Sequence, residues 1–407
     1  MTRILIYSHD TYGLGNIRRM VTIAQSLTQA DPTVSVLIIT GSPMLHAFRL
    51  PDRIDYVKLP CLTRTDAGQY DVAHLAISQD SARRMRSGII ASATIEFDPD
   101  IVLVDKKPLG VGGELFAALE ILQQRLNPPK LCLVLRDIID APEATRDVWA
   151  KNNYHRHIAA FYDDIYVVGS KDIFDLAKEY DFPDATTDKI TYTGFIRRSS
   201  GRASPADLRS RLGIGDDKIV LVQAGGGGDG IRLIDAYLDA LTHYRGGASY
   251  FSWIIAGPEM PRADRSRILR KTANIPNALV QEFSDDMNAC INTADYVVSM
   301  GGYNSICEIL SLGKPALIVP RVKPVSEQLV RAERLALNKT IDVLHPNHLS
   351  GQAMLGALEK LVHHGDSQLQ ARKYLDMGGL EKLPHYILHS IEATPAYSAR
   401  AANAAGA

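Results

Sequence analysis

The sequence predicts an α/β protein with two parallel-sheet domains, and three observations support this fold class. Short runs of β-branched and other apolar residues alternate with stretches of helical periodicity along most of the 407 residues. The runs are almost continuously apolar, which is typical of parallel strands that helices cover on both faces. A polar segment rich in Ser, Arg and Gly interrupts the alternation at 197–217, and a second strand–helix series follows it.

The strands follow in order from the apolar runs. In the first series we expect strands at 4–7, 34–39, 101–104, 131–135 and 165–168. In the second series we expect them at 219–223, 251–255, 278–280, 296–299 and 316–319. Helical periodicity separates these strands, for example at 20–27, 114–126 and 231–241.

These elements define the predicted domains. We expect one Rossmann-like domain at 1–196, an interdomain linker at 197–217 and a second Rossmann-like domain at 218–375. We expect a helix at 376–392 and a disordered tail at 393–407. The sequence leaves open whether this helix crosses back to the first domain. Because two open α/β domains follow each other in the chain, we expect them to face each other across a cleft at the carboxyl ends of their strands.

The composition argues against several classes of protein. The net charge of -1, from 45 basic and 46 acidic residues, gives no reason to expect a nucleic-acid partner. The four cysteines form no C-x-x-C pair, which indicates buried thiols in a reducing compartment. The N-terminus resembles no secretory signal, and no apolar run approaches the roughly 20 residues of a membrane span. We therefore expect a cytoplasmic protein, with peripheral contact at the inner face of a membrane as an option.

Two glycine-rich segments follow predicted strands and precede predicted helices. GLGNIRR at 13–19 suits a tight turn whose helix N-terminus presents N–H groups to an anion or polar ligand, and a turn without a ligand is the alternative. QAGGGGDG at 223–230 indicates a phosphate-binding nest, because glycines leave no Cβ between a ligand and the main chain; a flexible turn is the alternative. The second segment lacks the Lys-Ser or Lys-Thr of a Walker A loop, which disfavours nucleoside triphosphate hydrolysis.

A third segment carries the strongest signal. After the strand at 296–299, Gly301 and Gly302 open a helix whose first turns carry Asn304, Ser305 and Glu308. Residues three apart share one helix face, so Ser305 and Glu308 lie together near the helix N-terminus. The N–H groups there suit a diphosphate, and a carboxylate beside them can accept the two hydroxyls of a ribose. Stabilisation of the helix start by Glu308 is the alternative.

The segment 280–332 resembles the C-terminal donor domain of the MurG-like glycosyltransferases of GT-B architecture, the family of the peptidoglycan GlcNAc transferase. Residues 1–390 also resemble a bacterial group of predicted glycosyltransferases that shares YSHDTYGLGNIRR, DKKPLGVGGEL, LRDIID and YTGFIRR. The resemblance implies inverting transfer of a sugar from a nucleotide diphosphate sugar, UDP-GlcNAc being one candidate, to a hydroxyl of a glycan, glycolipid or small molecule. It implies neither a metal nor another cofactor.

The resemblance also implies a donor-binding set. Phe283 would lie beside the uracil, Asn304 and Ser305 would bind the diphosphate, and Glu308 would bind the ribose. Glu327 departs from the Gln pair that relatives place on the donor sugar, which leaves the sugar open. The full set is Arg198, Gly226, Gly227, Gly228, Asp229, Arg232, Phe283, Met287, Gly302, Asn304, Ser305, Glu308, Glu327 and Gln328. The two arginines and the helix N-termini would stabilise the departing diphosphate.

The acceptor side departs from the family at Asn16. Relatives usually carry a histidine there as the presumed base, and an asparagine cannot take a proton at neutral pH. The nearest titratable candidates for the base are His9 and Asp10, and a structural role for His9 is the alternative. The remaining acceptor-side candidates are Gly13, Gly15, Asn16, Asp105 and Arg136, with a helix cap for Asp105 and an Arg136–Asp137 ion pair as alternatives.

The acceptor itself is left open by the sequence. Arg83, Arg84 and Arg86 would either attract an anionic or membrane-bound acceptor or form a solvated helix face, and the second interpretation is favoured. Two rival functions remain: a UDP-sugar 2-epimerase or hydrolase of the same fold, and a non-catalytic nucleotide-sugar-binding protein. Release of UDP without an acceptor would favour the first, and tight binding without turnover the second.

Overall fold

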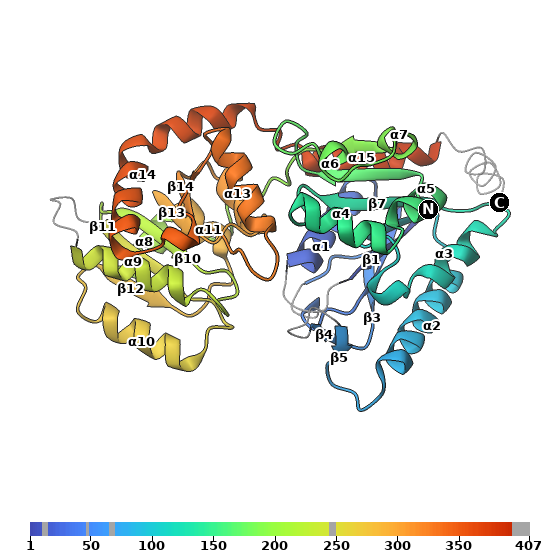
Figure 1. Cartoon of the computed structure of the whole chain (residues 1–407), viewed down its shortest axis with the longest axis horizontal. Coiled ribbons are helices and arrows are strands. Elements are labelled where there is room, and N and C mark those ends of the chain that lie inside the picture. The colour runs from blue at the N-terminus through green and yellow to red at the C-terminus, as the bar shows by residue number, and fades with distance from the viewer. Residues whose placement is uncertain (10–14, 46–48, 65–69, 244–249, 393–407) are drawn as a thin grey trace. The chain divides into compact units, whose positions relative to one another are not determined.

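The computed structural model describes residues 1–9, 15–45, 49–64, 70–243 and 250–392 (Figure 1). The chain divides into two compact units. Unit 1 contains Met1–Phe195 and the chain from Gly378 onward, and unit 2 contains Ile196–Met377. The chain therefore passes from one unit to the other twice.

Unit 1 is built on a parallel sheet. In the described residues this sheet has seven strands in the order β3-β2-β1-β6-β7-β8-β9. Their bounds are β1 Thr2–Ser8, β2 Val34–Thr40, β3 Ile54–Lys58, β6 Ile101–Asp105, β7 Lys130–Arg136, β8 Asp164–Val168 and β9 Ile190–Tyr192. The chain reverses its direction of strand addition between β1 and β6, where an open α/β sheet commonly binds its ligand. The short strands β4 Leu62–Arg64 and β5 Tyr70–Val72 form a separate antiparallel pair.

Helices flank the sheet of unit 1 (Figure 1). Their bounds are α1 Gly15–Ala30, α2 Gln79–Phe97, η2 Val111–Gly113, α3 Phe116–Gln123, α4 Pro142–Lys151, α5 Tyr154–Phe161, α6 Leu176–Glu179, α7 Asp184–Thr187 and α15 Gly379–Glu392. Helix α1 buries Ile17, Met20 and Leu27, spaced as one helical face, against β1 and β2. This packing fixes the start of α1 beside the carboxyl end of β1.

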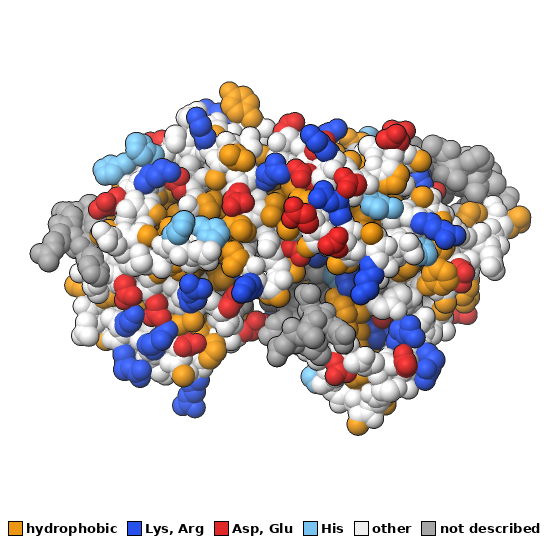
Figure 2. Space-filling view, viewed as in Figure 1, with side chains coloured by type: hydrophobic (Ala, Val, Ile, Leu, Met, Phe, Trp, Pro, Cys, Tyr) orange, Lys and Arg blue, Asp and Glu red, His pale blue; other side chains and the backbone are white. Residues whose placement is uncertain are grey.

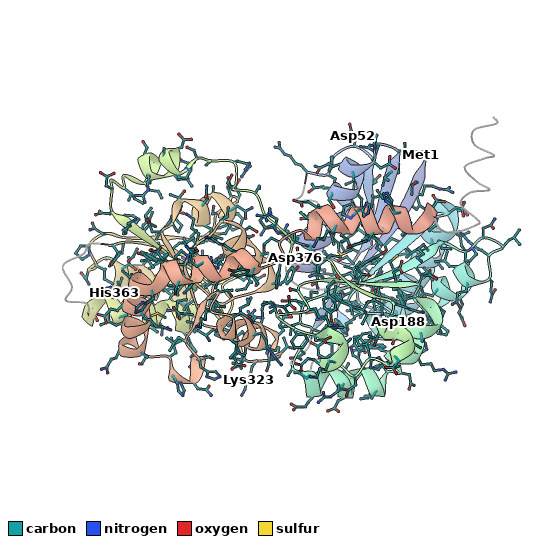
Figure 3. All side chains as sticks on the ribbon, turned by 90° about the horizontal axis from the view of Figure 1, so that it is seen from above. Met1, Asp52, Asp188, Lys323, His363 and Asp376 are labelled. Carbon is teal, nitrogen blue, oxygen red and sulfur yellow. The ribbon has the colours of Figure 1, made fainter. Side chains whose placement is uncertain are left out.

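The last helix, α15, belongs to unit 1. It packs against α1, and the N–H of Gly379 donates to the carbonyl of Phe195 at 3.0 Å. Its Tyr386 stacks on Tyr166 of β8 with ring centroids 6.4 Å apart. Asp376, labelled in Figure 3, precedes this helix, where the chain leaves unit 2. The option of a crossing back that the sequence left open is thus the arrangement that the structure adopts.

Unit 2 repeats the parallel architecture. Its described residues form a six-stranded sheet in the order β12-β11-β10-β13-β14-β15. The strands are β10 Lys218–Gln223, β11 Tyr250–Ile255, β12 Ala278–Gln281, β13 Tyr296–Ser299, β14 Ala316–Ile318 and β15 Asp342–Val343. The helices are α8 Pro205–Leu212, α9 Ile231–His243, α10 Arg262–Thr272, α11 Met287–Thr293, α12 Tyr303–Ser311, α13 Glu327–Leu337, η3 Pro346–His348, α14 Gly351–Ala371 and η4 Arg372–Tyr374. All the sheet pairings are parallel, so the carboxyl ends of these strands share one edge.

The segment 197–217, expected as a linker, lies within unit 2. Ser204 caps α8, which packs against α11. Arg202 forms an ion pair with Asp285 at 2.6 Å. A Cβ on Gly201 would lie 2.4 Å from the backbone nitrogen of Ala289, so the chain here is packed tightly against α11. The polar composition of the segment therefore reflects exposed faces of a folded element.

The surface agrees with the balanced charge of the sequence. Figure 2 shows basic and acidic side chains interspersed over the face that it displays. No helix in the described part of the chain is long and apolar enough to cross a membrane.

Candidate active site

The glycine-rich loop after β10 has two kinds of glycine. A Cβ on Gly227, whose φ is +92°, would lie 2.4 Å from the carbonyl oxygen of Ala256, and one on Gly230 would lie 2.2 Å from the Cβ of Ala224. These two glycines are required by packing within the protein. A Cβ on Gly228 would meet only the carboxylate of Glu259, at 3.9 Å. Packing within the protein thus explains the glycine at 227, whereas at 228 the missing Cβ leaves space beside the main chain, and donor binding by both residues stays a prediction.

The neighbouring loop after β11 explains this packing. A Cβ on Gly257, whose φ is +93°, would lie 2.5 Å from the carbonyl carbon of Gly226. A Cβ on Gly226 would in turn meet the carboxylate of Glu259 at 2.8 Å, and the N–H of Glu259 donates to the carbonyl of Gly226 at 2.8 Å. The two loops thus lie backbone against backbone at the carboxyl edge of the sheet, with Glu259 exposed beside them.

Helix α12 begins at the same edge of the sheet. Gly301, whose φ is +73°, turns the chain after β13, and a Cβ there would lie 2.6 Å from the side chain of Ile318. Gly302 is the N-cap and offers no side chain to bind the first-turn N–H groups. Such a helix start attracts anions through its N–H groups and its dipole. Ser305 is half-buried in the first turn, and Glu308 is buried one turn further along.

Arg198 is tied to α12 from the segment before α8. Its guanidinium Nη2 donates to Oδ1 of Asn304 at 3.0 Å. Its backbone N–H donates to Oγ of Ser311 at 2.9 Å. The structure therefore brings Arg198 and Asn304, two residues of the predicted donor set, into contact.

Arg321, which the sequence analysis did not single out, contacts two of the predicted donor residues. Its guanidinium binds both carboxylate oxygens of Asp229 at 2.6 and 2.7 Å, and its backbone N–H donates to Oε1 of Gln328 at 3.1 Å. The amide nitrogen of Gln328 lies 3.9 Å from the position of a Cβ on Gly302. Arg321 follows β14, close to the Lys323 labelled in Figure 3, and a basic residue after a parallel strand was the available signal.

The other predicted donor residues differ from one another in burial and in their partners. Glu327 is buried, and its carboxylate lies 3.6 Å from the guanidinium of Arg331, which also lies over the ring of Tyr303. Arg232 donates to the carbonyl of Pro346 at 3.3 Å. Phe283 is 56% exposed in the segment between β12 and α11, and Met287 is half-buried at the start of α11. An exposed aromatic ring at this edge leaves a face on which a flat base could stack.

In unit 1, four side chains form a closed polar ring at the carboxyl ends of β1 and β6. Nδ1 of His9 lies 3.2 Å from the carbonyl oxygen of Asp105 and 3.5 Å from its carboxylate. Nε2 of His9 lies 3.3 Å from the amide nitrogen of Asn16. Nη2 of Arg19 donates to the carboxylate of Asp105 and, at 3.3 Å, to Oδ1 of Asn16. His9, Arg19 and Asp105 are all buried, and Asn16 is half-buried.

The pKa values of Asp105 and His9 are both lowered in this ring. Burial alone would raise the pKa of Asp105, but the charge of Arg19 and the contacts with His9 outweigh it and lower that pKa from 3.8 to about 2. Burial lowers the pKa of His9, and the hydrogen bond and charge of Asp105 oppose this only in part. The ring therefore holds an ionised carboxylate beside a neutral imidazole at neutral pH.

Several acceptor-side expectations are resolved by this geometry. Asp105 ends β6 and pairs with Arg19, so it is not a helix cap. Gly15 is exposed at the first position of α1, and Arg136 is half-buried at the end of β7. Asp10 and Gly13 lie outside the described residues.

The expectation for Arg86 is wrong. Its guanidinium is fully buried, where Nε and Nη2 donate to the carboxylate of Glu114, both at 2.6 Å. The hydroxyl of Tyr7 donates to the same carboxylate at 2.5 Å and accepts from the N–H of Val111. Arg86 therefore holds α2 to the loop before α3, whereas Arg83 and Arg84 are exposed on α2. A lone sequence cannot show that one of three neighbouring arginines faces inward.

Comparison with known proteins finds similarity to glycosyltransferases. Residues 225–378 match the family described as Glycosyltransferase family 28 C-terminal domain. The UDP-N-acetylglucosamine–N-acetylmuramyl-(pentapeptide) pyrophosphoryl-undecaprenol N-acetylglucosamine transferase of Leuconostoc citreum is 26% identical over 277 residues, 66% of each chain. The protein of the same name from Glaesserella parasuis is 34% identical over 86 residues, 21% of this chain and 24% of its own. The alignments with these curated relatives thus span two thirds of their length or less.

Solved structures agree on the fold. MurG of Acinetobacter baumannii matches with a TM-score of 0.64 at 14% identity, over 96% of this chain and 100% of its own. The UDP-GlcNAc 2-epimerase of Neisseria meningitidis matches with a TM-score of 0.61 at 15% identity, over 96% of this chain and 100% of its own. The prediction of a GT-B fold and the resemblance to MurG-like glycosyltransferases are confirmed.

Proposed function

We propose that this chain, a MurG-like protein of GT-B fold whose unit 2 carries the family 28 C-terminal domain, transfers a sugar from a nucleotide diphosphate sugar to a hydroxyl group. Its curated relatives are named for transfer of N-acetylglucosamine from a UDP-sugar, which makes UDP-GlcNAc the first donor to test. In this proposal unit 2 binds the donor, and unit 1 supplies the base.

The observation that carries the proposal is the convergence of the donor segments at one edge of the unit 2 sheet. The start of α12, where the N-cap Gly302 supplies no capping side chain, and the loop at Gly228 lie where a diphosphate could approach the main chain. Arg198 reaches the first turn of α12, and Arg321 reaches the glycine-rich loop. The guanidinium of Arg198 and a helix start can offset the charge that develops on a departing nucleoside diphosphate, while Arg321 holds the carboxylate of Asp229 in the glycine-rich loop.

The reaction that we propose proceeds by inversion. The acceptor hydroxyl gives its proton to Nε2 of His9 while its oxygen bonds to the anomeric carbon. The bond between that carbon and the diphosphate oxygen breaks, and its electron pair leaves with the nucleoside diphosphate. The imidazolium that forms on His9 is stabilised by the carboxylate of Asp105, 3.5 Å from Nδ1.

We further propose that transfer needs no metal ion. The acidic pair Asp285 and Asp286 already has partners within the protein. Arg202 binds Asp285 at 2.6 Å, and its backbone N–H donates to Asp286 at 2.7 Å. Asp286 also caps α11 by accepting from the N–H of Ala289. Arg198, which reaches the first turn of α12, can supply positive charge instead.

The proposal extends to a lipid-linked acceptor at a membrane surface. The segment that leads into α2 exposes Leu75 and Ile77, at 47% and 36%, and α2 exposes Met85 at 45%. Arg83 and Arg84 are exposed on α2, next to Met85 in the sequence. Apolar side chains interleaved with basic ones suit an anionic lipid surface.

The test of the donor site is calorimetry with UDP and UDP-GlcNAc on Glu308→Gln, which keeps the shape of the buried side chain. A ribose that loses its carboxylate partner loses charge-assisted hydrogen bonds, so we expect the Kd to rise at least about tenfold. Glu333→Gln, an exposed glutamate on α13, is the matched control and should keep the wild-type Kd. An unchanged Kd in Glu308→Gln would remove the ribose assignment.

The reaction is tested by nucleoside diphosphate release from UDP-, GDP- and ADP-sugars, with water-soluble and lipid-linked glycans as acceptors. We expect release only when an acceptor is present, at an undiminished rate in the presence of a chelator. Release of UDP without an acceptor would replace the proposal by a hydrolase or 2-epimerase. Tight binding of a UDP-sugar with no turnover against any acceptor would replace it by a binding protein.

A further inference from the structure

We propose that Asn16 is a positioning residue that holds His9 in its neutral, proton-accepting form by presenting an amide N–H to the Nε2 lone pair. The catalytic meaning of this inference rests on the proposed function, because His9 is the base of that reaction. The assignment of hydrogens to the atoms of His9 and Asn16 does not rest on the proposed function, since it concerns only the hydrogen bonds within unit 1. Arg19 and Asp105 complete the arrangement.

The hydrogen-bond partners of His9 determine where its proton lies. Among the described residues, Nδ1 faces two acceptors, the carbonyl of Asp105 at 3.2 Å and its carboxylate at 3.5 Å, so Nδ1 carries the hydrogen. In the neutral ring Nε2 then carries a lone pair. The Asn16 amide lies 3.3 Å from Nε2 and can donate to it.

Arg19 fixes which end of the Asn16 amide faces His9. A guanidinium only donates, and its Nη2 lies 3.3 Å from the side chain of Asn16, so the oxygen of Asn16 must point to Arg19. The nitrogen of Asn16 must therefore point to His9. The reversed amide would place its N–H groups against the donors of Arg19 and its oxygen against a lone pair. The Arg19 side chain is in turn held by the buried carboxylate of Asp105.

This arrangement opposes protonation of His9. An imidazolium carries hydrogens on both ring nitrogens, and its Nε2–H would face the N–H of Asn16, donor against donor. Among the described residues, the charged groups that act on His9 are Asp105 at the end of β6 and Lys106 and Lys107 directly after it. Of these, only Asp105 favours the imidazolium. Asn16 adds a neutral group that opposes the charged form through hydrogen-bond direction.

The same contact determines how the base meets its substrate. The Asn16 amide occupies Nε2, so an acceptor hydroxyl must displace that amide before it can donate its own proton. Because the displaced amide is half-buried beside Nε2, it remains close enough to donate to the incoming oxygen. Asn16 thus positions the hydroxyl as well as the imidazole, at the place where relatives usually carry a histidine.

The experiment is an NMR titration of the full chain with ¹⁵N-labelled histidine side chains, the His9 signals being identified by their loss in His9→Gln. In the wild type we expect Nδ1–H and a bare Nε2 at pH 7. In Asn16→Ala the donor is gone, and in Asn16→Asp a carboxylate faces Nε2. We expect the His9 pKa to rise in Asn16→Ala and to rise further in Asn16→Asp, by about one unit or more, a tenfold change in proton affinity. Gln25→Leu, elsewhere on α1, is the matched control and should leave the titration unchanged.

The outcomes separate the two proposals. A wild-type His9 that is protonated at pH 7, or that carries its hydrogen on Nε2, would overturn the inference without any variant having to fold. Unmoved titration in both Asn16 variants would also overturn it, even if sugar transfer is found. A raised pKa in an enzyme that transfers no sugar would support the inference and refute the function. Where transfer is found, the acid limb of the kcat/KM profile should move with the His9 pKa in each variant.

Discussion

Asp105 is the residue on which the polar ring of unit 1 depends, since it binds both Arg19 and His9. Its carboxylate and the Arg19 guanidinium are 0% and 1% exposed, so neither charge has water as an alternative partner. Removal of one partner from a buried pair leaves the other charge uncompensated. The pair therefore makes Asp105 sensitive to substitution and to acid.

For Asp105→Asn we expect a loss of about 3–5 kcal/mol in the free energy of unfolding at pH 7, because Arg19 stays buried without its counter-charge. Urea denaturation of the variant and the wild type measures this loss. Asp80→Asn, which alters an exposed ion pair with Arg83, should change stability by less than about 0.5 kcal/mol. Equal effects in the two variants would contradict the buried role of Asp105.

The same residue predicts a pH dependence. Because its folded-state pKa is lowered from 3.8 to about 2, its contribution is present above about 3.8 and is lost as the pH falls toward 2. This contribution is on the order of 2 kcal/mol, and Asp105→Asn should lack it. The stability of the variant should thus fall less steeply than that of the wild type over this window.

The residue scale is also where prediction from the sequence was weakest. The sequence alone predicted that Asn16 cannot act as a base and that His9 is a candidate for that role, because both predictions depend only on residue type. The ring that joins these two to Arg19 and Asp105 was not, since it brings together the ends of two strands and one helix. Arg86 and Arg321 show the same limit, because the direction of a long side chain is set by tertiary contacts.

At the scale of elements, the glycine-rich loop contains one glycine that packing within the protein requires and a neighbouring glycine that it does not. Gly227 and Gly228 are neighbours, but a Cβ on the first meets backbone at 2.4 Å and one on the second meets only a flexible carboxylate at 3.9 Å. This difference allows a substitution at one position to serve as the control for the other.

We expect Gly227→Ala to destabilise the protein by more than about 2 kcal/mol, because it combines positive φ with a backbone clash. Gly228→Ala should unfold like the wild type but bind UDP-GlcNAc more weakly, because its methyl group would stand where we propose the diphosphate lies. Thermal unfolding and calorimetry on both variants measure the two effects. Full donor affinity in Gly228→Ala would show that the ligand does not approach this part of the loop.

The elements themselves were predictable where burial is two-sided. All the strands expected from continuous apolar runs are present, because central parallel strands are covered on both faces. The edge strand β3 was missed, since most of its residues are exposed or half-buried and its sequence IDYVK lacks a continuous apolar run. The short strands β9 and β15 were missed for the same reason.

At the scale of the whole molecule, α15 contributes to a unit from which it is separated in sequence by all of unit 2. It buries Leu383 and Ile387 fully in unit 1, and a Cβ on Gly379 would lie 2.7 Å from the carbonyl of Gly194. Sequence reasoning placed a helix here but left its destination open, since an amphipathic helix does not encode which surface will cover it.

A chain that ends at Met377 should therefore lose stability in unit 1 and keep it in unit 2. Hydrogen exchange followed by mass spectrometry should show faster exchange in α1 and β8, with protection of β10 to β14 unchanged. Burial of two large apolar side chains is worth about 3–6 kcal/mol, a large share of the stability of one domain. Uniformly faster exchange in both units would contradict this assignment.

The discontinuity of unit 1 also has a consequence for biosynthesis. The ribosome must translate Ile196–Met377 before it reaches α15, which takes roughly 10–35 s at about 5–20 residues/s. Throughout that interval the nascent first unit lacks its final helix, and the side of α1 that α15 covers stays open to chaperones and proteases. Unit 2 is thus fully synthesised before α15 emerges, and only then can unit 1 acquire its full set of packed helices.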